Sequence, residues 1–468
     1  MSAENSQAKF LTGNLMRHVT VMSLTSSIGL VAVFAVDFVD MIFISMLGHK
    51  ELAAAVGYAG SILFVTMSIS IGMSIATGAL VARHLGAGEI EHARLVTTHV
   101  LIYAGVFACV FASVFWSFLT PLTSLVGATG ETLDLAVDYL KIIVPGMPFI
   151  MLGIAASAVL RAYGDASKAM WVTIIAGLVN AVLDPILIFG MGLELQGAAI
   201  ASLISRISLM ITAFWLLTRH YGRFVRPDWG VFKGDIMRIT SIGFPAMLTN
   251  IATPIGAAYI TRLMAQFGEG AVAGMAITAR LTPISFAVVF ALSGAIGPIV
   301  GQNFGAKDMD RVSRAIRDAM VFTLVYVLLA SLILFVLRIP IADLFNAEGD
   351  TRTLIYLFCG PLALTWFFNG VIFIGNASFN NLGQPLTSTA INWGRNTVGT
   401  IPFAAYGAVV WGAEGVLIGQ AFGGAVFAVI SWGITARLLR YLRKHPEPPT
   451  RPSFVQRARQ VQLFFQRR

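Results

Sequence analysis

The chain has 468 residues, of which 57% are hydrophobic and 12% are charged, and its formal net charge is +9. A soluble domain does not need so large an apolar share for its core, so the composition excludes a soluble protein and favours an integral membrane protein. The positive charge lies in loops and in the C-terminal tail, and membrane topology explains it better than nucleic-acid binding does.

Apolar runs long enough to cross a hydrocarbon core of about 30 Å recur along the whole chain. Glycine, proline and charged residues divide them into twelve predicted transmembrane helices, at residues 18–47, 52–83, 94–117, 132–161, 166–190, 193–219, 235–266, 270–303, 312–338, 352–380, 384–410 and 412–440. The runs lack the two-residue alternation of a membrane β-barrel, so the predicted fold is all-α. The residues before the first helix lack the short apolar region of a cleavable signal, and we expect them to be retained.

Basic residues are distributed unequally between the loops on the two sides. With the N-terminus inside, the outer loops hold little beyond Lys50, Arg338 and Arg352. Loops rich in lysine and arginine stay on the cytoplasmic side, so both termini are predicted to lie in the cytoplasm. The inner-loop residues are Arg83, Arg94, Arg161, Lys168, Arg219, Arg223, Arg226, Lys233, Arg238, Lys307, Arg311, Arg314 and Arg317.

The two halves of the chain resemble each other at a constant offset of 219 residues, as between Gly86 and Gly305. LVARHLGAGEIEHAR (80–94) matches IVGQNFGAKDMDRVSR (299–314), and RAYGDASKA (161–169) matches FNNLGQPLT (379–387). Each half holds an even number of helices, so the repeats are parallel, an architecture in which substrate sites lie between two rocking lobes. The predicted units are a cytoplasmic segment 1–17, an N-lobe 18–219, a cytoplasmic linker 220–234, a C-lobe 235–441 and a basic cytoplasmic tail 442–468.

Acidic residues stand inside two apolar helices at similar depth. Asp40 and Asp184 each lie about eight residues before the predicted outer end of their helix. An ionised side chain at mid-bilayer costs about 2.5–3.5 kcal/mol, which makes such acids candidates for function. Asn180 shares a helix face with Asp184, Asp37 shares one with Asp40, and Pro185 is expected to kink the helix beside the acid. The pattern predicts a site for H⁺ or Na⁺; in the alternative, each acid is neutralised by a neighbour and only fixes helix packing.

Candidates for a substrate cavity come from the second half of the chain and from helix 4. Arg395, in NWGRNTVGTIP (392–402), either stabilises the C-lobe or tunes its cavity. PGMPFIML (145–152) and LTWFFNGVIF (364–373), which holds Trp366, supply either cavity walls or lipid-facing surface. No zinc-ligand cluster and no nucleotide-binding motif is present in the sequence, so we expect no enzyme and no cofactor other than a coupling ion.

Several short stretches, in this order along the chain, resemble the multidrug and toxic compound extrusion (MATE) family. They are DMIFISMLG (40–48), LGAGE (85–89), GLVNAVLDPILIFG (177–190), LQGAAIAS (195–202) and GFPAML (243–248). The resemblance covers nearly the whole chain apart from the tail.

The resemblance implies two six-helix lobes around a V-shaped cavity. It implies a secondary antiporter that expels cationic, amphiphilic drugs across the inner membrane in exchange for H⁺ or Na⁺. The family's ion site falls on Asp40, Asn180 and Asp184, which would be the Na⁺ ligands if Na⁺ is the coupling ion. An aromatic residue of helix 4 falls on Tyr139, and a hydroxyl of helix 6 falls on Ser202.

Two departures bear on the coupling ion. Relatives often have asparagine where this chain has Asp37, which adds a titratable group. The second half lacks the embedded acids of one bacterial branch, so the sequence looks closer to the DinF-like branch, whose ion site is in the N-lobe.

Other functions remain as alternatives. A lipid-linked saccharide flippase of similar architecture would want several cations for a pyrophosphate, and only Arg395, Arg262 and Arg280 are available. A membrane enzyme or a non-transporting sensor is a third interpretation. The expected partners are small organic cations or other amphiphiles and membrane lipid, without nucleic acid, and the expected state is a monomer.

Overall fold

The structure, a computed structural model, describes residues 8–47, 50–222 and 224–445, and these residues form helices joined by short turns. The first half comprises η2 (Lys9–Leu11), α1 (Leu15–Met46), α2 (Lys50–Gly86), α3 (Ile90–Ser117), α4 (Leu119–Leu125), α5 (Gly130–Ile143), η3 (Val144–Gly146), α6 (Met147–Ala162), α7 (Ala166–Pro185), η4 (Ile186–Gly190) and α8 (Glu194–Tyr221). The second half comprises α9 (Trp229–Met264), η5 (Ala265–Phe267), α10 (Glu269–Ser285), α11 (Ala287–Gly305), α12 (Met309–Leu344), α13 (Gly349–Leu357), η6 (Phe358–Leu362), α14 (Trp366–Asn381), α15 (Pro385–Asn396) and α16 (Ile401–Lys444). Most of the predicted tail, from residue 446 onward, and residues 1–7 lie outside the described residues.

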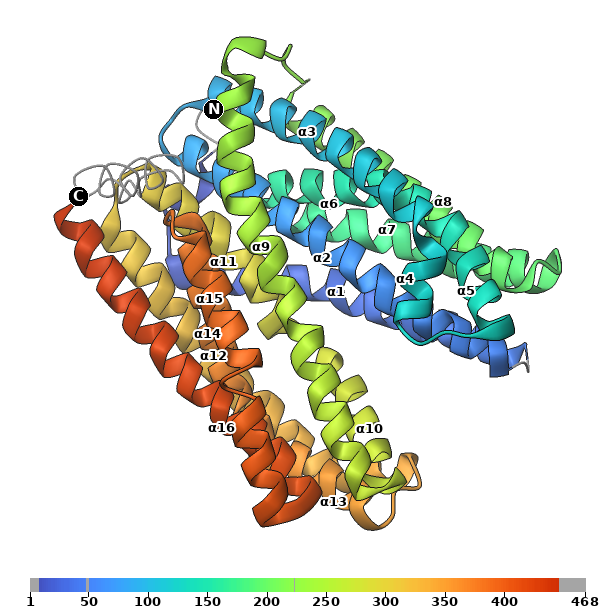
Figure 1. The fold of residues 1–468 in the computed structure, drawn as a ribbon. Coiled ribbons are helices and arrows are strands. Elements are labelled where there is room, and N and C mark those ends of the chain that lie inside the picture. The colour runs from blue at the N-terminus through green and yellow to red at the C-terminus, as the bar shows by residue number, and fades with distance from the viewer. Residues whose placement is uncertain (1–7, 48–49, 223, 446–468) are drawn as a thin grey trace, which may run out of the picture.

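The helices form two bundles, the N-lobe (α1 to α8) and the C-lobe (α9 to α16). Figure 1 shows that the bundles meet near the C-terminal ends of α2 and α11 and diverge toward α5 and α13. This arrangement confirms the predicted all-α fold with two six-helix repeats in a V.

Each lobe also receives the beginning of a helix from the other lobe. Helix α1 contacts α11 and α12 of the C-lobe as well as α7 of its own lobe, and α9 contacts α2. The buried side chains of early α1 share one apolar cluster with α11 and α12; they are Leu15, Val19 and Met22. Three residues of α9 belong instead to the N-lobe core; they are Ile239, Ile242 and Met247. Helix α1 therefore connects the interior of one lobe to the interior of the other.

A pair of glycine contacts holds the lobes together at the closed end of the V. A Cβ atom added at Gly86 of α2 would lie 1.9 Å from the backbone oxygen of Gln302, and one added at Gly305 of α11 would lie 2.0 Å from that of Arg83. Gly86 and Gly305 are 219 residues apart, as are Arg83 and Gln302, so equivalent positions of the two repeats meet. Arg83 lies within α2 rather than in a loop, and its Nη2 donates to the backbone oxygen of Asn381 at 2.8 Å. Because the backbones touch, no passage runs between α2 and α11 at this point.

Helix α16 doubles back on itself. Its backbone leaves the helical conformation at Gly412, whose φ is +60°. A Cβ atom at Gly423 would lie 1.4 Å from the oxygen of Gly399, and one at Gly407 would lie 2.0 Å from that of Gly415. Both contacting pairs are centred on Trp411, directly before Gly412, which identifies an antiparallel helical hairpin; small residues allow its limbs this close approach.

The hairpin accounts for part of the difference between the predicted and observed numbers of spans. By length and apolarity, nine helices in the described ranges could cross a membrane, or ten if the bent pair Gly349–Leu362 and Trp366–Asn381 counts as one. The segment Pro385–Lys444 is counted once although it reverses at Gly412. Helix α9 is not counted because threonine, asparagine, glycine and proline dilute its apolar residues. With α9 and both limbs included, the described helices accommodate the twelve predicted spans.

Candidate ion-coupling site and central cavity

Three polar side chains from α1 and α7 meet inside the N-lobe. The Asn180 amide nitrogen donates to Asp40 Oδ1 and Oδ2, each at 3.1 Å, and to Asp184 Oδ2 at 2.7 Å. Asn180 and Asp184 are one turn apart on α7, whereas Asp40 comes from α1. The structure thus brings together the three residues that the sequence singles out, which we call the N-lobe cluster.

The N-lobe cluster is deeply buried on its α7 side. Asp184 is 1% exposed and Asn180 is 5% exposed. Asp184 Oδ1 is buried and has no hydrogen-bond partner among the described residues. A buried, unpaired carboxylate oxygen is costly, because protein has replaced the water that would solvate it. A proton or a cation on this pair of carboxyl groups would offset that cost.

The local sequence explains the position of Asp184. Asp165 caps the start of α7, and the regular α-helix ends at Pro185, directly after the acid. Proline has no N–H to donate to the carbonyl one turn earlier, and a π-helical turn, Ile186–Gly190, follows. The change in helix geometry beside Asp184 agrees with the kink predicted from Pro185.

Asp37 lies one turn from Asp40 on α1 but outside the hydrogen-bonded group. Its side chain is exposed, and it makes no hydrogen bond to another described residue. It remains close enough to Asp40 for their charges to interact. Asp37 is therefore a neighbour of the N-lobe cluster and not a member of it.

Tyr139 lies close to the N-lobe cluster, beside Ser202. Tyr139, on α5, is 8% exposed and lies beside Ser202 of α8 and close to both acids. Arg206, one turn after Ser202, faces Tyr139 and donates through Nη1 to the backbone oxygen of Ile143 at 3.1 Å. Sequence reasoning missed Arg206, although an arginine within the apolar run SLISRISLM (202–210) meets the same criterion that identified the acids.

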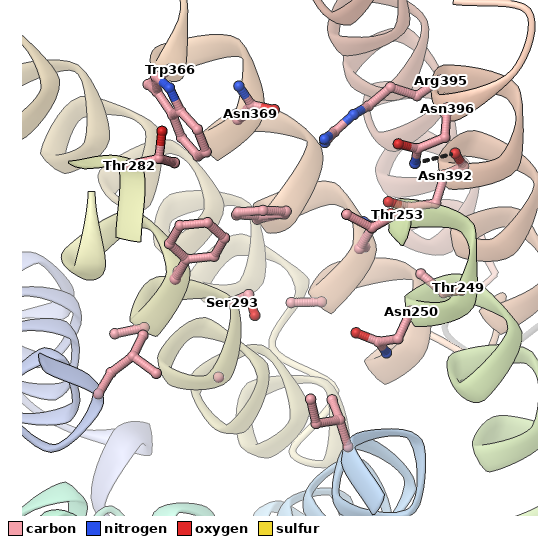
Figure 2. Close-up of a pocket in the computed structure, with 18 of the residues that line it drawn as sticks. Thr249, Asn250, Thr253, Thr282, Ser293, Trp366, Asn369, Asn392, Arg395 and Asn396 are labelled. Carbon is pink, nitrogen blue, oxygen red and sulfur yellow. Dashed lines mark hydrogen bonds between the residues drawn. The ribbon is translucent and has the colours of Figure 1, made fainter. Parts of the chain in front are cut away.

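A large cavity of about 940 Å³ lies between the lobes. Its size falls at the upper end of the range for small-molecule sites. Arg395 and Trp366 line it, whereas Tyr139, Ser202 and the three residues of the N-lobe cluster do not. Figure 2 shows Arg395 reaching into this central cavity from α15, with Trp366 and Asn369 on α14 on the far side. The acids are therefore spatially separate from the central cavity.

The N-lobe contributes a second arginine to the central cavity. Arg161, near the end of α6, lines it and donates to Ser74 Oγ at 3.4 Å. The sequence groups Arg161 with the inner loops because it immediately precedes a turn. The structure corrects this placement, since Arg161 lies within a helix and faces the interior.

A two-lobed helical bundle with many apolar spans, a cavity between the lobes and carboxyl groups buried in one of them defines a polytopic membrane transporter. Comparison with known proteins gives the family. The MatE family model matches residues 26–186 and 245–406, once in each lobe. The chain belongs to this family, and it is a multi-pass membrane transporter rather than an enzyme.

Individual relatives align over most of the chain. An FAD transporter of Shewanella oneidensis is 29% identical over 418 residues, which cover 87% of this chain and 91% of that protein. A probable multidrug resistance protein, NorM of Thermotoga maritima, is 26% identical over 365 residues, covering 75% and 77% of the two chains. The crystal structure of a mutant of the Vibrio cholerae MATE transporter VcmN superposes with a TM-score of 0.86 at 26% identity and covers 91% of this chain and 97% of that one. These likenesses identify a MATE-family efflux transporter.

Proposed function

We propose that this protein is a secondary antiporter of the inner membrane that exports amphiphilic organic molecules in exchange for H⁺ or Na⁺. The supporting observation is the N-lobe cluster, in which two carboxyl groups share one amide and one carboxyl oxygen has no partner among the described residues. Such a site stays uncharged or balanced only when it holds a proton or a cation. We take Asp40, Asn180 and Asp184 as the ligands of either ion, and Asp37 as a titratable neighbour.

Helix α1 supplies a route from ion binding to movement of the lobes. Asp40 lies in the second half of α1, and the first half of this helix packs into the C-lobe core. In the proposed cycle, occupancy of the N-lobe cluster bends or shifts α1, changes the packing between the lobes and releases the cargo outward. The return to the inward-facing state releases the ion. Ion and cargo drive each other only if they prefer different states of the lobes.

The names of the relatives leave the charge of the cargo open between two classes. NorM is described as a probable multidrug resistance protein, which agrees with the organic cations expected from the sequence. The Shewanella oneidensis relative is described as an FAD transporter, which corresponds to an aromatic anion. For cationic cargo, the N-lobe acids are the available negative charges, although they lie outside the central cavity.

The remaining assignments follow from the same proposal. We propose cytoplasmic termini, a monomer and membership of the DinF-like branch, in agreement with the distribution of basic loop residues and the N-lobe position of the acids. A lipid-linked saccharide flippase remains the alternative. Of the arginines considered for its pyrophosphate, Arg262 and Arg280 are exposed outside the cavity lining, which leaves Arg395 together with Arg161.

Gradient-driven uptake into everted membrane vesicles tests the proposal, because export becomes uptake in this orientation. Two probes, the cationic dye ethidium and FAD, are offered under an imposed H⁺ or Na⁺ gradient. We expect the wild type to accumulate at least one probe, and Asp40→Asn and Asp184→Asn to lose this accumulation. Asp37→Asn is expected to keep transport but to change its pH dependence.

Asp138→Asn is the matched control, since Asp138 is an exposed N-lobe carboxylate paired only with Lys141, at 2.8 Å. It should transport like the wild type. Full uptake by both Asp40→Asn and Asp184→Asn, at membrane levels equal to those of the control, would remove the proposed coupling site.

A further inference from the structure

The central cavity carries positive charge without an acid to balance it. Arg161 and Arg395 line it from opposite lobes, and among the described residues no aspartate or glutamate does. Buried positive charges disfavour a cationic ligand and favour an anionic one, more strongly in a poorly solvated cavity than in water. The polarity of the cavity is thus opposite to that of the N-lobe cluster.

Arg395 has donor capacity that the surrounding protein does not use. Its Nη1 is buried and has no hydrogen-bond partner among the described residues. The amide nitrogens of the neighbouring asparagines donate within α15, Asn392 to Ser388 O and Asn396 to Asn392 O, both at 2.9 Å. Their oxygens do not accept from Arg395 Nη1, which has no partner among the described residues. Figure 2 shows the guanidinium extending away from α15 toward Asn369. A guanidinium in this position suits a phosphate or carboxylate, which accepts from two of its nitrogens at once.

The facing helix supplies acceptors. On α14, the side-chain oxygens of Asn376, Asn380 and Asn381 are buried without partners among the described residues. All three residues line the central cavity. Buried polar atoms are normally hydrogen-bonded, so this part of α14 holds unused acceptors beside the cavity. They are polar but carry no charge, so they do not offset the positive charge of the arginines.

An aromatic wall completes the site. Trp366 lines the cavity and is stacked on Phe286, with ring centroids 4.7 Å apart and an interplanar angle of 10°. Phe290, also in the lining, lies 5.4 Å from Trp366 and 5.6 Å from Phe373. Mutual packing holds these rings in place, so a planar ligand meets a preformed apolar surface.

We propose that the central cavity binds a planar aromatic organic anion, with the phosphate or carboxylate held by Arg395 and the ring system against Trp366 and Phe290. The proposal rests on the proposed transport function and specifies its cargo. Arg161 adds a second positive charge from the N-lobe. Organic cations are disfavoured at this site, whatever their affinity for the acids elsewhere in the N-lobe.

Equilibrium binding to the purified protein in phosphatidylcholine nanodiscs tests this assignment without any ion gradient. Flavin mononucleotide (FMN) and riboflavin are suitable probes, since they share a fluorescent ring system and differ by one phosphate. We expect the wild type to bind FMN at least tenfold more tightly than riboflavin, and ethidium more weakly than FMN. Because a hydrogen bond to a charged group contributes roughly 1.5–3 kcal/mol, Arg395→Gln should weaken FMN binding on the order of ten- to a hundredfold and leave riboflavin binding nearly unchanged.

Two further variants test whether the effect comes from the paired donors of Arg395 and whether it is specific to this position. Arg395→Lys keeps the charge but not the paired donors, and should retain part of the preference for FMN. Arg280→Gln makes the same change at an exposed position outside the cavity and should match the wild type. Equal binding of FMN and riboflavin by the wild type, tighter binding of ethidium than of FMN, or an unchanged preference in a folded Arg395→Gln protein would overturn the assignment. Such a failure would leave gradient-driven export intact, since Asp40 and Asp184 are not varied here.

Discussion

At the residue scale, one amide organises the N-lobe cluster, the proposed ion-coupling site. The nitrogen of Asn180 contacts oxygens of both Asp40 and Asp184, so a single side chain holds two acids from different helices together. An amide nitrogen donates but carries no charge, so it orients the carboxyl groups without neutralising them. The negative charge remains for the transported ion to balance.

A different acid stabilises the N-lobe outside the membrane spans. Asp165, in the turn between α6 and α7, accepts from the hydroxyl of Tyr221 on α8 at 2.9 Å and from the ammonium group of Lys168. Burial alone would raise the pKa of Asp165, but the hydrogen bonds from Lys168 and Tyr221 outweigh it and lower the pKa below its ordinary value of 3.8. The ionised form therefore stabilises the folded state.

This pKa shift gives a pH-dependent prediction. The stabilisation is fully present above the ordinary pKa and is lost as the pH falls through the lower, folded-state pKa. Asp165→Asn keeps an acceptor for the α7 cap but removes the charge, and should lower the free energy of unfolding by about 1–2 kcal/mol at neutral pH. Thermal unfolding in detergent should show this difference shrinking below about pH 4. If Asp165→Asn lowered stability by the same amount at neutral and acidic pH, the charge of Asp165 would not be the cause.

The sequence identified individual residues where a charged side chain lies within an apolar helix. Asp40 and Asp184 stand out because carboxyl groups are rare in apolar helices, and their similar depth correctly suggests proximity. The sequence could not determine which way a side chain points, so Tyr139 and Arg395 were both candidates for one cavity although only Arg395 lines it. The sequence did not identify Arg161 as a cavity residue, because an arginine at the end of a helix gives the same sequence pattern whether it faces water or the protein interior.

At the element scale, α1 and the α16 hairpin determine how the bundles fit together. Helix α1 is long enough to contact α7 in its own lobe and α11 in the other. In α16, glycines allow the two limbs to touch through their backbones. In the proposed cycle the first feature transmits a shift between the lobes, and the second packs the two limbs of α16 closely together.

From the close contact in the hairpin we expect alanine substitutions at two glycines of α16 to have different effects on stability. A Cβ atom at Gly423 would lie 1.4 Å from the oxygen of Gly399, whereas one at Gly433 would meet nothing within 4 Å. Gly423→Ala should therefore force the limbs apart and destabilise the protein by about 1–3 kcal/mol. Gly433→Ala should be neutral or slightly stabilising, because alanine favours the helix. Melting temperatures of the two variants in one detergent provide the measurement, and equal stability would argue against the tight limb contact.

Apolar runs and their punctuation located the spans, and the predicted boundary between 384–410 and 412–440 falls at the observed reversal of α16. The two antiparallel limbs are nearly continuous in sequence because the reversal occupies only Trp411 and Gly412. The turn depends on a backbone conformation rather than on a polar loop. Helix α9 shows the opposite limit, since it is too polar for a length and apolarity test but pairs with α2 of the other lobe. The prediction of twelve spans included α9 because it came from apolar runs divided by glycine, proline and charged residues rather than from an apolarity threshold.

At the scale of the whole molecule, the internal repeat produces the closed end of the V. Gly86 approaches Gln302 as Gly305 approaches Arg83, so two copies of one motif contact each other around a local twofold axis. The constant offset made the two-lobe architecture predictable from sequence. The contact itself was not, since matching motifs in two halves do not reveal whether they touch.

The central claim is that cation occupancy of the N-lobe cluster determines how the lobes are arranged. Spin labels at Leu125→Cys on α4 and Leu344→Cys on α12 report on the diverging ends, since both positions are well exposed, at 84% and 76%. The background replaces Cys109 and Cys359 with alanine, and Asp138→Asn, which removes one exposed carboxylate of the N-lobe, serves as the control.

Double electron–electron resonance then measures the distance between the labels as pH or Na⁺ concentration is varied in nanodiscs. The account predicts that the distance distribution of the wild type and of the Asp138→Asn control shifts with one of these ions, and that the combined Asp40→Asn and Asp184→Asn variant stays in a single distribution. A distribution that responds equally with and without the two carboxyl groups, or that does not respond to either ion in the wild type, would contradict it.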